Sequence, residues 1–114
     1  MILRLHLIER ILHAVSFSIL DVCTPIKLVT KRWGNEISWT FGACSSSQEY
    51  GSHNIYTEEC CQKAGSYPIV CSDSYGDGWH GGYLEIEGTK YCTDFMDGLV
   101  KTEEATMGKN KNLS

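Results

Sequence analysis

Hydrophobic and polar residues alternate over several short stretches after Thr24, and no long helical periodicity interrupts them. The clearest stretch is residues 36–42, EISWTFG, where Ile37, Trp39 and Phe41 share one face and polar residues occupy the other. We expect these three side chains to face a core. The same reasoning predicts strands at 25–30, 36–42, 66–72, 82–88 and 90–95, with one more over 99–107.

The connections between these stretches carry turn signals. Glu87-Gly88-Thr89 predicts a hairpin between two of the strands. Pro68 removes a backbone donor, which predicts that residues 66–72 form an edge strand or contain a bulge. Residues 43–64 are polar and rich in serine, and we expect a loop there. Short strands with Gly-rich turns predict an antiparallel sandwich or small barrel.

Six cysteines lie between positions 23 and 92 of this 114-residue chain, whose length indicates a single domain. Their even number favours a disulfide framework formed in an oxidising compartment, and so a secreted protein. Six cysteines allow fifteen pairings, so sequence does not fix the connectivity. We favour Cys44 with Cys60, which would close the serine-rich loop, and different partners for Cys60 and Cys61. The remaining candidates are Cys23, Cys71 and Cys92.

The apolar residues 1–20 can be interpreted in two ways. Arg4 and Arg10 before ILHAVSFSIL suit a short signal peptide, although Glu9 and His13 do not; alternatively, apolar residues at helical spacing suit an N-terminal helix. We favour the signal peptide because of the cysteines downstream. The predicted organisation is a leader or helix over 1–20, a module over 23–107 and a disordered tail over 108–114.

The formal net charge is −4, with acids and bases interspersed. A phosphate backbone requires a basic stripe, so we expect no nucleic-acid partner. No apolar run has the length of a membrane span, so we expect no transmembrane segment. Oligomeric state stays open.

Two segments, VTKRWGNEISWTFG and DSYGDGWHGGYLEIEG, resemble a small secreted module found in extracellular proteins of invertebrates, algae and bacteria. Its recurring features are an E-x-x-W strand and a D-S-Y-G-D-G-W-x-G loop. The resemblance covers roughly residues 23–96 and implies an extracellular β-rich adhesion or matrix role, with no catalytic residues to carry over. The fold expected is a small antiparallel β-sandwich of the jelly-roll or CUB-like kind, stapled by disulfides.

The loop at residues 73–83 supplies the candidate chemistry, and calcium is the first hypothesis. Calcium takes oxygen ligands, which Asp73 and Asp77 offer, and the loop glycines can present backbone carbonyls. Glu36 would join them if its strand pairs beside residues 66–72. Asp94 and Asn35 are further candidates.

The loop is not an EF-hand, because Tyr75 and Leu84 occupy ligand positions and no helices are expected around it. A second interpretation makes the loop a turn only. Aspartates then cap backbone amides, and Tyr75 and Trp79 cover the end of the core.

Carbohydrate binding is a further hypothesis, in which Trp79, His80 and Tyr83 stack on a sugar. The alternative is that Trp33, Trp39 and Trp79 are mainly core, and we assign Trp39 there. Zinc is rejected, because its candidate ligands have no recognised spacing: His53, Cys60, Cys61 and His80.

The sequence thus predicts an extracellular binding or matrix module that contacts glycan or protein with weak single-site affinity through the 73–83 loop. Calcium binding in that loop and a turn without metal both stay open. A purely structural or defence-type domain is the alternative. We do not expect an enzyme. A glycan hydrolase would use Asp73 and Asp77 as its carboxylate pair, and nothing in the sequence sets such a pair in a cleft.

Overall fold

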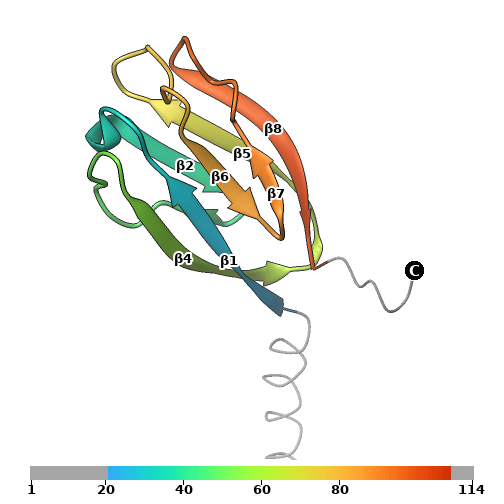
Figure 1. Cartoon of the computed structure of the whole chain (residues 1–114). Coiled ribbons are helices and arrows are strands. Elements are labelled where there is room, and N and C mark those ends of the chain that lie inside the picture. The colour runs from blue at the N-terminus through green and yellow to red at the C-terminus, as the bar shows by residue number, and fades with distance from the viewer. Residues whose placement is uncertain (1–20, 109–114) are drawn as a thin grey trace, which may run out of the picture.

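The computed structural model describes residues 21–108, which form two facing four-stranded sheets with every pairing antiparallel (Figure 1). One sheet has the order β4-β1-β6-β7 and the other β3-β2-β5-β8. The chain is therefore an all-β sandwich, as the alternation predicts. The elements are β1 (Asp21–Val29), the 3-10 turn η1 (Gly34–Glu36), β2 (Ile37–Phe41), β3 (Cys44–Ser45), β4 (Ile55–Lys63), β5 (Gly65–Asp73), β6 (Tyr83–Ile86), β7 (Thr89–Tyr91) and β8 (Val100–Met107).

The core lies between the sheets and is built from the predicted alternation. Trp39 and Phe41 of β2 are buried, as are Leu84 and Ile86 of β6 on the opposite sheet. Trp33 is the exception, because it precedes η1 and is 51% exposed. The core expectation is confirmed for Trp39 and wrong for Trp33.

Three disulfides reinforce this sandwich: Cys44–Cys60, Cys71–Cys92 and Cys23–Cys61. The favoured Cys44–Cys60 pairing is confirmed, and the neighbours Cys60 and Cys61 do bond to different partners. Two bridges join the two sheets, since Cys44 and Cys71 lie in the second sheet and their partners lie in or next to the first. Cys23–Cys61 instead links adjacent strands of one sheet.

The polar segment 43–64 is not a loop throughout, because it contains β3 and the nine-residue strand β4. The strand β4 forms the edge of its sheet, and its inward positions include the polar residues Glu58 and Gln62, so no hydrophobic alternation marks it in the sequence. The strand predicted over residues 90–95 is shorter than expected. β7 ends at Tyr91 and the chain turns at Cys92, whose φ of 61° is left-handed.

Pro68 is in an interior strand, contrary to the prediction of an edge or bulge. β5 lies between β2 and β8, and the Pro68 carbonyl accepts from Gly42, beyond the last β2 register pair, Phe41 with Ile69. In an antiparallel strand, the N–H and C=O of one residue point to the same neighbour, so a Pro68 N–H would face β2 beyond the end of its ladder. The ring therefore costs no sheet hydrogen bond.

The β6–β7 hairpin forms as predicted, around Glu87 and Gly88. Both have positive φ, 49° and 86°, as a two-residue turn matching the twist of the strands requires. The predictions for residues 1–20 and 109–114 lie outside the described residues. Over 21–108, no helix has the length and apolarity to cross a membrane.

Candidate functional site

Strand pairing brings the predicted carboxylates together at one end of the sandwich. β2 pairs with β5 so that Ile37 lies opposite Asp73, which places Glu36 beside the start of the 73–83 loop. The Ser74 N–H donates to the Glu36 carbonyl at 3.0 Å and fixes this approach. The condition set for Glu36 from sequence, pairing next to residues 66–72, is therefore met.

Asp73 holds the loop in shape with one carboxylate oxygen. It is 2% exposed, and its Oδ2 accepts the backbone N–H groups of Gly76, Asp77 and Gly78 at 2.8, 2.6 and 2.9 Å. Gly78 has φ +78°, and a Cβ there would come within 2.5 Å of the Phe95 carbonyl oxygen. The turn interpretation is correct in this respect, because an aspartate caps three amides.

The other oxygen of Asp73 faces a second group of ligands. One carboxylate oxygen from each of Glu36, Asp73 and Asp77 lies within 4.8 Å of the other two. His80 joins them, with Nε2 3.2 Å from Asp77 Oδ2. We call these four residues the acidic cluster.

Several buried polar atoms of the acidic cluster make no hydrogen bond. Within residues 21–108, four buried side-chain polar atoms have no hydrogen-bond partner, and all four lie here: Glu36 Oε1, Asp73 Oδ1, Asp77 Oδ1 and His80 Nε2. Of these, His80 Nε2 has its ion-pair contact with Asp77, whereas the three carboxylate oxygens have no partner. Buried polar atoms are normally paired, and a group of unpaired acceptors is the arrangement a bound ion satisfies. The cluster thus has unused capacity for a positive charge.

The pKa values of Glu36 and Asp73 are shifted in opposite directions by their surroundings. Burial, and then the adjacent Asp73 carboxylate, raises the pKa of Glu36 above its ordinary value. Burial also favours protonation of Asp73, but the hydrogen bonds it receives, from Asp77 first, outweigh burial and hold its pKa below the ordinary value. Glu36 therefore takes up a proton before Asp73 does as the pH falls.

The donor set suits a hard divalent cation. Asp73 Oδ2 accepts three amides, so the three carboxylates leave up to five oxygens for a cation. Calcium binds six to eight oxygen ligands, so backbone carbonyls or water would complete its coordination. The further candidates Asp94 and Asn35 do not join them. Asp94 pairs with Lys101 at 3.1 Å, and Asn35 is exposed.

The sugar-stacking residues do not form a platform. Trp79 is 0% exposed, packs on Phe95 and donates its indole N–H to the Ser72 carbonyl at 2.9 Å, so the expectation that it contacts a ligand is wrong. His80 is half-buried beside Asp77. Tyr83 is half-buried with Lys90 over its ring, 4.6 Å from the centroid.

An exposed apolar surface lies next to the acidic cluster, and sequence reasoning missed it. Tyr75 is 76% exposed, Leu99 60% and Met96 61%. Two backbone hydrogen bonds join their loops, Gly98 to Gly76 and Asp73 to Leu99. We call Tyr75, Met96 and Leu99 the apolar patch. The sequence feature that could have indicated this patch is the run FMDGLV, where apolar residues flank a turn and do not alternate as in a strand.

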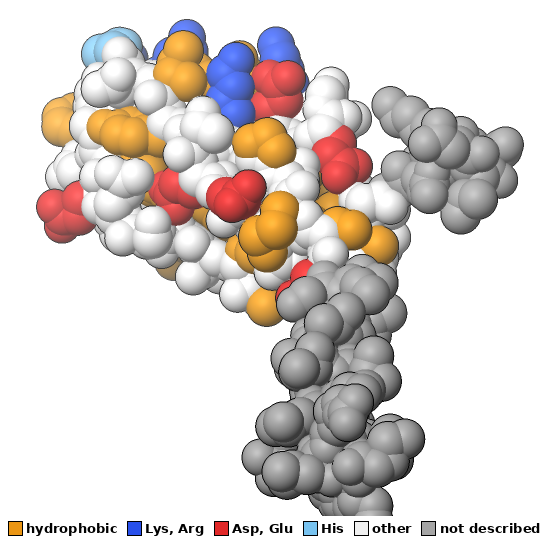
Figure 2. Space-filling model, turned by 90° about the horizontal axis from the view of Figure 1, so that it is seen from below, with side chains coloured by type: hydrophobic (Ala, Val, Ile, Leu, Met, Phe, Trp, Pro, Cys, Tyr) orange, Lys and Arg blue, Asp and Glu red, His pale blue; other side chains and the backbone are white. Residues whose placement is uncertain are grey.

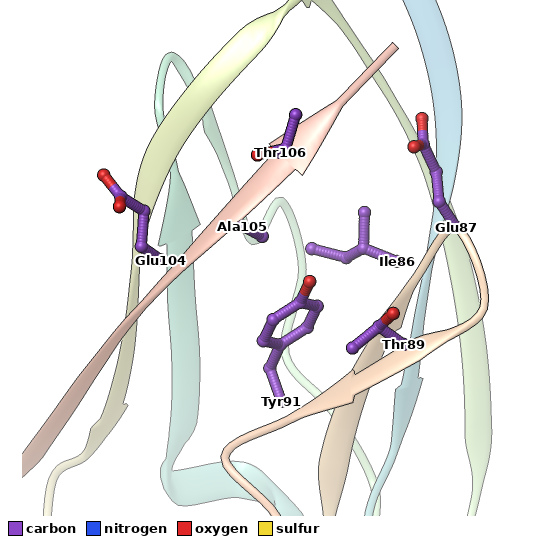
Figure 3. A pocket seen from close by; sticks show the side chains of 7 residues that line it. All are labelled: Ile86, Glu87, Thr89, Tyr91, Glu104, Ala105 and Thr106. Atoms are coloured by element: carbon purple, nitrogen blue, oxygen red, sulfur yellow. The ribbon is translucent and has the colours of Figure 1, made fainter. Parts of the chain in front are cut away.

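A groove of about 640 Å³ opens at the β7/β8 margin, between the β6–β7 hairpin and β8 (Figure 3). Its lining is Ile86, Glu87, Thr89, Tyr91, Glu104, Ala105 and Thr106, none of which belongs to the acidic cluster. The groove is open and largely polar. We therefore place the candidate site at the 73–83 loop rather than here.

The face in Figure 2 mixes acidic, apolar and polar side chains, with basic ones near one rim. No extended patch of one charge covers this face.

Comparisons with protein-family models, curated proteins and solved structures find no match to this chain. Function is therefore inferred from the chemistry of the site itself.

Proposed function

We propose that the chain is an extracellular module that binds a protein ligand through its 73–83 loop, which a calcium ion holds in place. The observation that carries this proposal is the convergence of three buried carboxylate oxygens without hydrogen-bond partners in the acidic cluster. The three disulfides support an extracellular setting, because they form and persist in oxidising compartments.

Calcium would act by joining separate parts of the chain. Glu36 belongs to η1, Asp73 ends β5, and Asp77 lies within the loop and bridges Gly98. A cation shared by the three carboxylates ties these segments to one another. It also cancels the repulsion among negative charges that lie within 4.8 Å. The ion would therefore stabilise the loop as well as the fold.

The ligand surface that such an ion would order is the apolar patch. Tyr75 lies between two cluster carboxylates in sequence, and Leu99 packs against Gly76, where an added Cβ would lie 3.3 Å from its side chain. Tyrosine and methionine are enriched in protein interfaces, and exposed apolar groups gathered at one place mark interaction sites. A protein ligand fits this surface better than a sugar, since Trp79 is buried.

The other candidate functions have less support. A glycan hydrolase needs accessible carboxyls, whereas Asp73 is buried and uses Oδ2 to cap three amides. A purely structural or defence-type domain would need no apolar patch beside the acidic cluster. We keep the prediction that the chain is not an enzyme.

Thermal melts in calcium and in chelator test the metal. Extracellular calcium modules bind with Kd of about 0.1–1 mM, so 10 mM calcium should stabilise the fold by about 1.4–2.7 kcal/mol. The melting temperature should then rise by roughly 6–20 °C. Asp77→Asn should abolish the rise, whereas Asp97→Asn, which changes an exposed acid outside the cluster, should keep it. An equal rise in wild type and Asp77→Asn, or none in wild type, would refute the calcium site.

Binding to an array of extracellular proteins, in calcium and in chelator, tests the surface. We expect micromolar or weaker binding that Tyr75→Ser abolishes and chelation reduces. Ile55→Ser is the matched control, because Ile55 is 60% exposed but lies at the start of β4. Binding lost equally in both variants, or found only on a glycan array, would contradict the proposal. Absence of any ligand would favour the structural alternative.

A further inference from the structure

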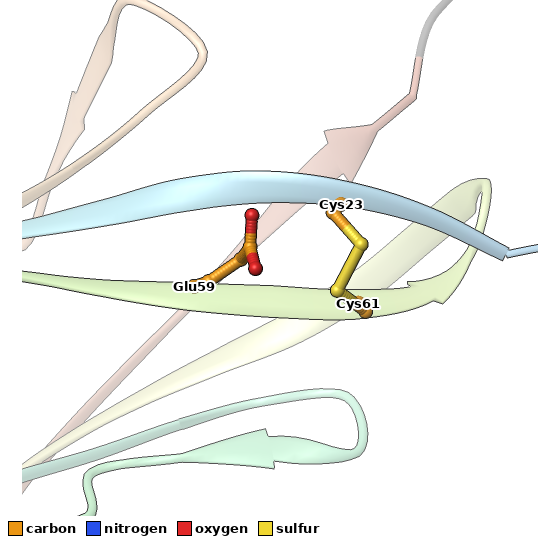
Figure 4. A group of neighbouring side chains, drawn as sticks. All are labelled: Cys23, Glu59 and Cys61. Atoms are coloured by element: carbon orange, nitrogen blue, oxygen red, sulfur yellow. A yellow bond between two sulfur atoms is a disulfide. The ribbon is translucent and has the colours of Figure 1, made fainter.

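The disulfide Cys23–Cys61 differs from the other two in its exposure. Cys23 of β1 and Cys61 of β4 are directly opposed in the antiparallel register, and both are exposed (Figure 4). The strand β4 is the edge of its sheet, so nothing within residues 21–108 pairs with its outer side. A thiolate in solution can therefore approach both sulfurs.

The other two bridges are shielded by the core. Cys71 and Cys92 are 0% and 1% exposed, and Cys60 is 1% exposed, although its partner Cys44 is half-buried. Exchange requires a thiolate to reach a disulfide sulfur in line, and exposed disulfides are the labile ones. A thiol will thus open Cys23–Cys61 before Cys71–Cys92 or Cys44–Cys60.

Opening this bridge leaves the fold held together. β1 and β4 share nine register pairs, and both bridges between the sheets stay closed. Successive side chains of a strand point to opposite faces, so Cys61 faces out while Cys60 faces the core. A freed Cys61 thiolate therefore points away from Cys44–Cys60 and cannot attack it without local unfolding.

We propose that Cys23–Cys61 is a thiol–disulfide exchange site, through which the module forms a reversible covalent link to a cysteine-bearing peptide or protein. The thiolate of that molecule attacks one sulfur, the Cys23–Cys61 bond breaks, and the other cysteine leaves as a thiolate that then takes a proton from water. The product is one mixed disulfide and one free thiol. Attack by that thiol on the mixed disulfide restores Cys23–Cys61 and expels the original thiolate, so no net redox agent is consumed.

Glu59 sets the rate of this step. Its carboxylate and the two sulfurs lie within 4.8 Å of one another on the same face of β1 and β4 (Figure 4). The negative charge repels an incoming thiolate and disfavours the departing one. At low salt, a unit charge at about 5 Å in water changes the rate about fourfold. Glu59→Gln should accelerate exchange by that factor, and added salt should reduce the difference.

Incubation of the native protein with glutathione, followed by acid quench, alkylation and peptide mapping, tests the proposal. Glutathione should appear on Cys23 or Cys61 alone, with circular dichroism unchanged. Glu59→Gln should react about fourfold faster at low salt. Glu104→Gln, which changes an exposed carboxylate on β8, should react at the wild-type rate.

Equal or earlier opening of Cys71–Cys92 or Cys44–Cys60 would overturn the proposal, as would loss of the β-sheet signal when Cys23–Cys61 opens. An unchanged rate in Glu59→Gln would remove the role of that carboxylate. The double variant Cys23→Ser/Cys61→Ser should fold and take up no glutathione. If it fails to fold, mapping of the native chain still decides, because it needs no substitution.

Discussion

Substitution of Asp73 separates its capping role from its metal role. In Asp73→Ala, three backbone N–H groups that now donate to Oδ2 lose their acceptor. In Asp73→Asn, an amide oxygen can still accept from them, and only the charge is lost. The two variants should therefore differ in stability even in chelator, where no cation contributes.

The expected loss follows from the burial of the three donors. A hydrogen bond to a charged group contributes about 1.5–3 kcal/mol, and water can replace it at a part-exposed donor. The Gly78 N–H is buried and those of Gly76 and Asp77 are part-buried, so we assign about 2 kcal/mol to the first and about 1 to each of the others. Relief of repulsion toward the neighbouring carboxylates returns about 1 kcal/mol. Asp73→Ala should then lose about 3 kcal/mol, and Asp73→Asn about 1.

Urea denaturation in chelator, with the disulfides intact, measures both values. For a domain of 60–100 residues, a loss of about 3 kcal/mol lowers the melting temperature by roughly 12–24 °C. Addition of calcium should stabilise neither variant. A loss below about 1 kcal/mol in Asp73→Ala, or equal losses in the two variants, would refute the capping argument.

Three further predictions concern pH, backbone and core. Because the pKa of Glu36 is raised, its protonated form stabilises the calcium-free fold below pH 4.5, and this contribution is lost as the pH rises through the folded value. Calcium needs the ionised form, so the calcium-dependent rise in melting temperature should grow as the pH rises above 4.5. Gly78→Ala should lower the free energy of unfolding by at least about 2 kcal/mol, because the added Cβ meets both a left-handed φ and a backbone clash. Gly88→Ala has a similar φ but open space, and should lower it by about 1 kcal/mol. Urea denaturation measures both values. Tyr50→Phe should lower the free energy of unfolding by about 2 kcal/mol, because it removes the acceptor of a buried indole N–H. Tyr56→Phe removes the acceptor of an exposed amide and should lower it by about 0.5 kcal/mol. Similar losses in the two variants would contradict this expectation.

The parts of the fold that sequence could predict are those where one face of a strand is buried. The alternation at Ile37, Trp39 and Phe41 reports such a face, and it also places Glu36 at the end of a strand. The edge strand β4 gave no such signal, because the polar residues Glu58 and Gln62 occupy inward positions. Residues that lie on an edge are chosen for solubility rather than for packing.

The candidate site shows the same division. Its carboxylates could be predicted from residue type and from strand pairing. The burial of Trp79 could not, because a tryptophan among glycines has the same sequence signature whether it covers the core or faces solvent. The two interpretations of Asp73 also proved compatible. One oxygen caps the turn while the other faces the acidic cluster, a distinction that sequence does not contain.

The two margins of the sandwich are closed to different extents. Along one margin β3 lies next to β4, and Cys44–Cys60 fastens the sheets there. Along the other, three-residue β7 is too short to cover eight-residue β8, which leaves the groove shown in Figure 3. Water can enter the interior most easily through that groove, and Cys71–Cys92 fastens this margin only at the end of β7. Thermal opening should therefore begin at the groove, next to the β6–β7 hairpin. Amide protons of β8 should consequently exchange with solvent earlier than those of β1.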